Sequence, residues 1–348
     1  MIELIKKLSN AHGISGFEDE IREIVKAEVE DFADEVKVDK MGNVIATKNG
    51  NDLSLMLSAH MDEIGFVVKK IDEKGFIRFA PIGGWFSQIV VGQRVILYGK
   101  KKFYGVVGCK PPHVMKEEER KKAIEISDMF IDIGAKSKEE VIKLGINVGT
   151  PIAIDREVAL LENNRITGKA FDNRVGLAVA IESFRRCKNS ATIHLVASSQ
   201  EEVGLKGAKC SAYLLNPDVG IAVDSCPSTD FPGSEAVHMD VSLGKGPVIT
   251  IVDASGRGLI VSQKVLEWLR ETAEKNGIPY QLEVAEGGTT DATAINLTRE
   301  GIPAGVVSIP ARYIHSPVEV VDLKDVEWAV ELVKKAMENV NEYFRVEK

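Results

Sequence analysis

Apolar residues recur every three or four positions in several parts of the chain, a spacing that places them on one face of a helix. Near the start, this spacing predicts helices over residues 2–10 and 17–35, the second with Ser15 and Glu18 as a capping box. It also predicts helices over residues 175–184, 206–215, 262–276 and 323–344. The last of these is long and amphipathic.

Short apolar runs bounded by turn residues alternate with these helices and predict buried strands. They cover residues 36–39, 43–47, 53–59, 191–199, 219–223, 248–252, 280–284 and 304–309. An alternation of strands and helices is typical of an α/β domain in which helices cover a sheet.

The part of the chain from about residue 67 to 164 has a different pattern. Short alternating segments are separated by turns rich in glycine and lysine, and one short helix begins with Ser137 and Glu140 as its capping box. The segments span residues 75–81, 94–98, 103–108, 129–134 and 150–155. This pattern predicts a small β-barrel or sandwich. We therefore expect one α/β domain, residues 1–66 with 165–348, and an inserted β-rich domain, residues 67–164.

Composition excludes several classes of protein. A chain of 348 residues with 44% hydrophobic and 28% charged residues is expected to fold with a large core, and its net charge of −8 argues against a nucleic-acid partner. No apolar stretch is long enough to cross a bilayer and no cleavage signal follows the charged start, so we expect a cytoplasmic protein without a membrane segment. The four cysteines are far apart and form no Cys-x-x-Cys pair, which argues against a disulfide framework.

Polar residues that could carry chemistry follow the predicted strands. In an open α/β sheet the carboxyl ends of the strands form the site, so residues that are distant in sequence can meet there. Glu201 and Glu202 are neighbours, and on an extended chain they would point to opposite faces, one toward a metal and the other toward a proton. Asp172 opens a helix, where a capping role is the simplest local interpretation. The candidates are His60, Asp62, Asp172, Glu201, Glu202, Asp224 and His315.

If one glutamate of the Glu201–Glu202 pair binds a metal, the possible ligands are two histidines and three carboxylates, which include Asp172 and Asp224. This set suits a divalent transition metal such as Zn or Co better than Mg or Ca. Five ligands are too many for one tetrahedral catalytic zinc, but they suit two metals roughly 3.5–4 Å apart that share a bridging carboxylate. The sequence has no Gly-x-Ser-x-Gly elbow, no His-Glu-x-x-His helix and no phosphate-binding loop. A glycosidase pair of carboxylates stays open, although it would leave the histidines unexplained.

Six motifs in this order resemble the M42 family of metallo-aminopeptidases, the self-compartmentalising tetrahedral enzymes. They are Ala-His-Met-Asp-Glu at 59–63, Lys-Ala-Phe-Asp-Asn-Arg at 169–174, Gln-Glu-Glu-Val-Gly at 200–204, Ala-Val-Asp-Ser at 222–225, Gly-Gly-Thr-Thr-Asp-Ala at 287–292 and Pro-Ala-Arg-Tyr-Ile-His-Ser at 310–316. The resemblance covers nearly the whole chain, with no departure at a metal or base position.

The resemblance implies a mixed-sheet catalytic domain with an inserted, PDZ-like barrel for dimerisation. It implies two divalent ions, Zn or Co, with Asp172 as the bridge. His60 and Asp224 would complete one metal site, and Glu202 and His315 the other. Glu201 would be the general base, and Asp62 would orient His60. It further implies an aminopeptidase that acts on short unfolded peptides and assembles from dimers into a tetrahedral dodecamer.

Other functions remain open at this point. A carboxypeptidase or deacylase could use the same ligands and would differ only in substrate, and an endoglucanase is the weaker alternative. A metal-binding protein without activity would have no use for Glu201. The loops at residues 83–86 and 287–290 are candidates for the substrate pocket, because exposed aromatic and glycine-rich segments are unusual without a role. Core packing of Trp85 and a plain turn at the glycines are equally good interpretations.

Overall fold

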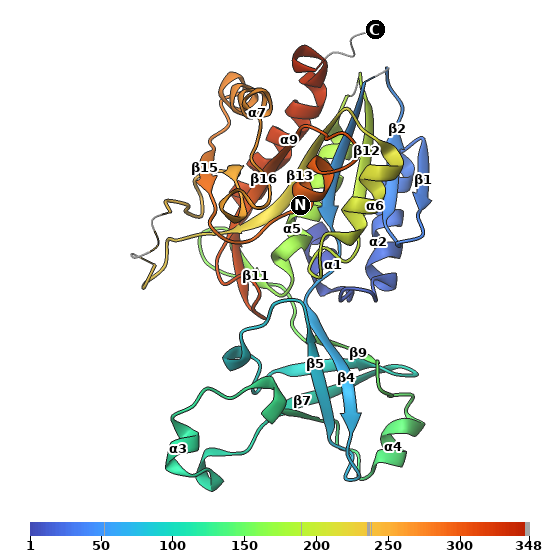
Figure 1. Ribbon diagram of the computed structural model, residues 1–348, viewed down its shortest axis with the longest axis vertical. Helices are drawn as coiled ribbons and strands as arrows, with labels where there is room; N and C mark the ends of the chain where they lie inside the picture. The colour runs from blue at the N-terminus through green and yellow to red at the C-terminus, as the bar shows by residue number, and fades with distance from the viewer. Residues whose placement is uncertain (52, 189, 235–236, 238, 345–348) are drawn as a thin grey trace.

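The computed structural model describes residues 1–344 except 52, 189, 235–236 and 238. A mixed sheet covered by helices forms one part, and a β-barrel that projects from it forms the other (Figure 1). Each part has its own cluster of buried apolar side chains. The expected fold class, a mixed-sheet α/β domain with a small barrel inserted into it, is confirmed.

The sheet has eight strands in the order β1-β2-β12-β3-β13-β16-β14-β15. The central strands β12, β3, β13 and β16 are parallel, whereas β2 and β14 run antiparallel to their neighbours β12 and β16. The parallel strands are almost wholly buried, as expected for strands with helices on both faces. The strands span Glu35–Val38, Val44–Lys48, Thr192–Ser198, Ser54–His60, Val219–Pro227, Ala304–Ala311, Val248–Val252 and Gln281–Val284, in sheet order.

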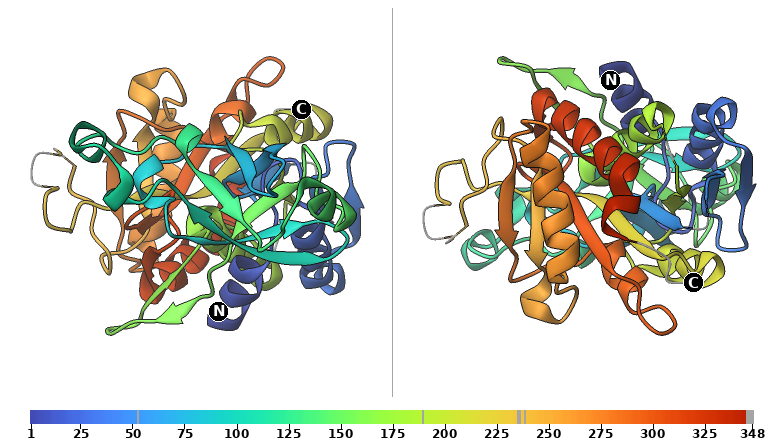
Figure 2. Two further views of the ribbon diagram at one scale, coloured as in Figure 1. Left: turned by 90° about the horizontal axis from the view of Figure 1, so that it is seen from below. Right: turned by 90° about the horizontal axis from the view of Figure 1, so that it is seen from above.

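Helices cover both faces of this sheet. The central helix α5 contacts β3, β13 and the helices α1, α2 and α9, and α7 packs against α9. Helices α6 and α8 contact each other; α6 also contacts β12 and β3, and α8 contacts β3, β13 and β16. In the view from above, α9 in red and α6 in yellow-green lie on opposite sides of the sheet (Figure 2). The helices span Ile2–Asn10, Asp19–Val29, Phe171–Arg186, Lys206–Leu215, Gln263–Lys275, Asp291–Asn296 and Leu323–Tyr343 for α1, α2 and α5 to α9.

The barrel closes in the order β4-β5-β8-β7-β6-β9, with every pair antiparallel. Its strands, in that order, are Gly65–Ile71, Ile77–Ile82, Phe130–Asp132, Lys102–Gly108, Arg94–Tyr98 and Pro151–Ile154. The short helices α3, Glu117–Arg120, and α4, Lys138–Lys143, interrupt them, and the Ser137 cap of α4 is confirmed because its hydroxyl accepts a hydrogen bond from the Glu140 amide.

A small third sheet joins β10, Ala159–Leu160, to β11, Arg165–Gly168, and β17, Glu319–Asp322. None of these three strands was predicted from the sequence, nor were β4 and α8. The predicted helix 17–35 was too long, since α2 ends at Val29 and β1 begins at Glu35. In the part of the chain that the structure describes, no helix is long and apolar enough to cross a membrane.

Candidate active site

The candidate residues come from five separate segments that meet at one edge of the sheet. His60 ends β3, Glu201 and Glu202 lie just beyond β12, and Asp224 lies near the end of β13. The parallel register explains the convergence, because Ser198 at the end of β12 pairs with His60. Asp172 lies in the first turn of α5, and His315 lies in the loop between β16 and β17.

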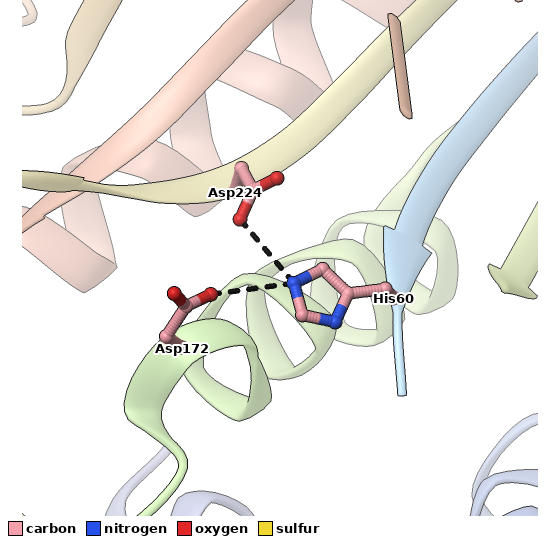
Figure 3. A group of neighbouring side chains, drawn as sticks. All are labelled: His60, Asp172 and Asp224. Atoms are coloured by element: carbon pink, nitrogen blue, oxygen red, sulfur yellow. Dashed lines mark hydrogen bonds and ion pairs between the residues drawn. The ribbon is translucent and has the colours of Figure 1, made fainter. Parts of the chain in front are cut away.

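The first cluster joins His60 to two carboxylates (Figure 3). The His60 Nε2 atom lies 3.3 Å from Oδ1 of Asp172 and 3.6 Å from Oδ1 of Asp224. The three side chains converge from β3, α5 and β13, and one possible ligand atom from each lies within 4.8 Å of the others. This spacing is suitable for one metal ion.

The second cluster uses the other oxygen of Asp172. The His315 Nε2 atom lies 3.3 Å from Oδ2 of Asp172 and 3.2 Å from Oε2 of Glu202. Asp172 therefore faces both clusters with one oxygen each, as a bridging carboxylate does between two metals. Asp172 was interpreted locally as a helix cap, but α5 begins at Phe171 and no side chain caps it, so that interpretation was wrong.

The largely buried carboxylates of the two clusters make the site favourable for cations. Burial raises the pKa of Asp224 to about 7, and the nearby Asp172 carboxylate adds to this rise. Burial lowers the pKa of His315, but the Asp172 and Glu202 carboxylates outweigh it and raise this pKa to about 11. Glu202 Oε1 is buried and has no hydrogen-bond partner among the described residues. A cation among these ligands would neutralise the crowded carboxylates and use the unpaired oxygen, so the residues fit two divalent metals.

Glu201 lies beside the first cluster. Its Oε2 atom is 3.8 Å from Nε2 of His60, and burial together with the nearby carboxylates raises its pKa well above the usual value. A carboxylate whose pKa is raised in this way is suited to accept and return a proton near neutral pH.

Asp62 fixes the geometry behind both glutamates. Its Oδ1 atom accepts the backbone N–H of Glu201 at 3.0 Å and lies 3.4 Å from Nδ1 of His60, and its Oδ2 atom accepts the N–H of Glu202 at 3.2 Å. Ser15 donates its hydroxyl to the same Oδ2 at 2.6 Å. The capping role predicted for Ser15 was therefore wrong, since α2 has no side-chain cap.

Glu319 is a positioning residue that sequence reasoning missed. Its Oε2 atom accepts the backbone N–H of Asp172 at 2.8 Å, and its Oε1 atom accepts the N–H of His315 at 2.9 Å. One buried carboxylate thus holds the backbone of Asp172, which faces both clusters, and of His315 in the second cluster. The only signal in the sequence is its place four residues after His315.

We expect Glu319→Gln to weaken activity without unfolding the protein, because one of the two backbone N–H groups would face an amide nitrogen instead of an oxygen. Changes to groups that orient metal ligands typically cost about 10- to 100-fold in metal affinity or activity. Metal affinity and kcat, measured beside an exposed control, Glu327→Gln, test this. Wild-type metal affinity and wild-type kcat in Glu319→Gln would show that Glu319 does not position the ligands.

A cavity of about 400 Å³ opens from the two clusters. The loop at residues 287–290 lines it, as expected for a pocket segment. The loop at residues 83–86 was also predicted for the pocket, but none of its residues is among those described that line this cavity. Gly84 lies against His315, because a Cβ atom at this position would be 3.1 Å from Nδ1 of His315. Trp85 stacks on Phe66 of the barrel core and donates its indole N–H to the carbonyl oxygen of Gly65.

Comparisons with known proteins agree with this geometry. The model of the M42 glutamyl aminopeptidase family matches residues 42–332. A lysyl aminopeptidase from Pyrococcus furiosus is 37% identical over 97% of this chain and 97% of its own. An aminopeptidase structure from Desulfurococcus kamchatkensis is 46% identical with a TM-score of 0.94, covering 100% of this chain and 98% of its own. The TET1 peptidase of Pyrococcus horikoshii, which can assemble into a tetrahedron or a large octahedral shell, is 35% identical with a TM-score of 0.87, covering 97% and 99%.

Proposed function

Because the chain belongs to the M42 family of aminopeptidases and is a peptide hydrolase, we propose that it removes N-terminal residues with two divalent metal ions. His60 and Asp224 would hold one ion, Glu202 and His315 the other, and Asp172 would bridge them. The observation that supports this most strongly is the Asp172 carboxylate, which has one oxygen 3.3 Å from each histidine. Mixed nitrogen and oxygen ligands favour Zn or Co.

The protein's own groups have distinct roles in this proposal. When bound, two such ions polarise the peptide carbonyl and acidify a water molecule. Glu201 accepts the proton of the attacking water and passes it to the nitrogen of the leaving amine. Asp62 holds the backbone of Glu201 and the His60 ring, so the base and the ligand keep a fixed separation. The free α-amino group of the substrate docks beside the metals or a neighbouring carboxylate, which restricts cleavage to the chain end.

We further propose that the barrel mediates dimerisation and that dimers assemble into a tetrahedral dodecamer that admits short unfolded peptides. The shells formed by the TET1 relative support this. In this chain, the barrel exposes Tyr104 and Val106, which are two residues apart on β7 and so share its outer face. The expected mass in solution is about 456 kDa, twelve times the 38.0 kDa chain. A stable monomer at micromolar concentration would contradict this assembly.

A panel of aminoacyl-anilides with N-acetylated counterparts tests the proposed reaction. We expect cleavage of the free-amine substrates only, abolished by a chelator and restored by Zn or Co, because the α-amino group and the metals are both required. Cleavage of acetylated substrates at equal rates, or activity that ignores the chelator, would contradict the proposal. The names of the family and of the lysyl relative differ in the residue removed, so they assign no side-chain preference to this chain.

A further inference from the structure

Two carboxylates that belong to neither metal cluster line the same cavity. Glu283 lies on β15, and Asp253 directly follows β14. Glu283 is 4% exposed and Asp253 is 3% exposed, so both are almost fully removed from water. Buried carboxylates without a cationic partner are costly, which makes this pair a candidate for binding one.

The described residues give these carboxylates neutral hydrogen-bond donors. Glu283 Oε2 accepts the Thr250 hydroxyl at 2.9 Å, Asp253 Oδ1 accepts the N–H of Leu259, and Asp253 Oδ2 lies 3.5 Å from the hydroxyls of Thr289 and Thr293. Neither carboxylate has an ion pair with a lysine or arginine of the described residues. Burial raises the pKa of both groups, and the charge of Asp253 adds to the rise for Glu283. The two carboxylates reach the same cavity from the paired strands β14 and β15, so a cation bound there would be attracted by both.

The rest of the cavity lining is suited to a cation at the end of an aliphatic side chain. The cavity wall includes the apolar residues Cys226, Ala285 and Ile314, and it has no lysine or arginine among the described residues. The volume of about 400 Å³ is within the usual range for a small-molecule site. A long side chain with apolar methylene groups and a positive end matches both features.

We propose that this part of the cavity receives the side chain of the substrate's first residue and that Asp253 and Glu283 select lysine and arginine. This inference rests on the proposed aminopeptidase function. An acidic first residue would be repelled by the same two carboxylates, and an apolar one would leave them buried without a cationic partner. Basic residues are the class that gains a charge-assisted hydrogen bond here.

The test begins with the wild-type protein loaded with Zn or Co and lysyl-, arginyl-, leucyl- and glutamyl-anilides. We expect the largest kcat/KM for the lysyl and arginyl substrates and the smallest for the glutamyl substrate. Glu283→Gln should then lower kcat/KM for the basic substrates by about 10- to 100-fold, the range for loss of one charged hydrogen bond. Leucyl turnover should stay equal or rise, because the amide removes a buried charge that an apolar residue leaves without a cationic partner. The circular dichroism spectrum and the midpoint of thermal unfolding report that the variant is folded.

Glu286→Gln is the matched control, because Glu286 is exposed, three residues away and outside the cavity lining, and it should keep the wild-type preference. Metal-dependent cleavage that favours leucyl or glutamyl substrates would overturn this inference while leaving the proposed function intact. An equal loss on all substrates in Glu283→Gln would also overturn it, because the carboxylate would then bind the α-amino group. Activity that ignores the chelator would overturn the proposed function and, with it, this inference.

Discussion

Glu201→Gln is expected to abolish nearly all turnover while the protein keeps its fold and its metals. Glutamine has the size of glutamate but cannot take the proton of the attacking water. General base catalysis typically contributes about 10²- to 10⁴-fold, so we expect a loss in kcat of that order. Glu201 is not needed for either cluster of ligand atoms, which is why metal content should stay the same.

The measurement combines kcat on the best anilide substrate, metal content by elemental analysis and the midpoint of thermal unfolding. Glu286→Gln, an exposed glutamate outside the cavity, is the control and should match the wild type in all three. Normal turnover in metal-loaded Glu201→Gln would show that another group accepts the proton.

Asp172→Asn is expected to affect both metal sites at once. Each oxygen of Asp172 faces one cluster, and asparagine would replace one of them with an NH₂ group that cannot bind a cation. Since a catalytic metal contributes several kcal/mol, we expect activity to fall on the order of a thousand-fold or more. The metal content should fall below two ions per chain.

Asp19→Asn is a matched control, because Asp19 also lies in the first turn of a helix but is exposed at the surface. It should retain full metal content and activity. If Asp172→Asn instead kept two ions per chain with wild-type affinity, Asp172 would not bind them, and the bridging role would be wrong.

The sequence predicted the parts of the site that local pattern determines. His60 and Asp224 were found because each ends an apolar run, and the parallel strands carry both to one edge of the sheet. The long helices α7 and α9 and the central strands were found for the same reason, since their period is repeated often enough to recognise. Phe17 and Phe32 also fit the helical period, but they are 42% and 45% exposed and lie beyond the ends of α2.

What the sequence could not predict depends on contacts between distant segments. Glu319 meets Asp172 only because β17 pairs with β11, which directly precedes α5, and β17 has too few residues to show a period. Ser15 fits a capping box locally, yet the fold brings it to Asp62. No motif in the sequence distinguishes Asp253 and Glu283 from other acidic residues. They line one cavity because β14 and β15 pair.

Anomalous diffraction from crystals of the Zn- or Co-loaded protein is the strongest test of the proposal that two divalent metals share Asp172. We expect two peaks roughly 3.5–4 Å apart, the spacing of two-metal sites. One should lie among His60, Asp172 and Asp224, and the other among Asp172, Glu202 and His315. A single peak, or peaks that do not contact Asp172, in crystals of an active protein would contradict it.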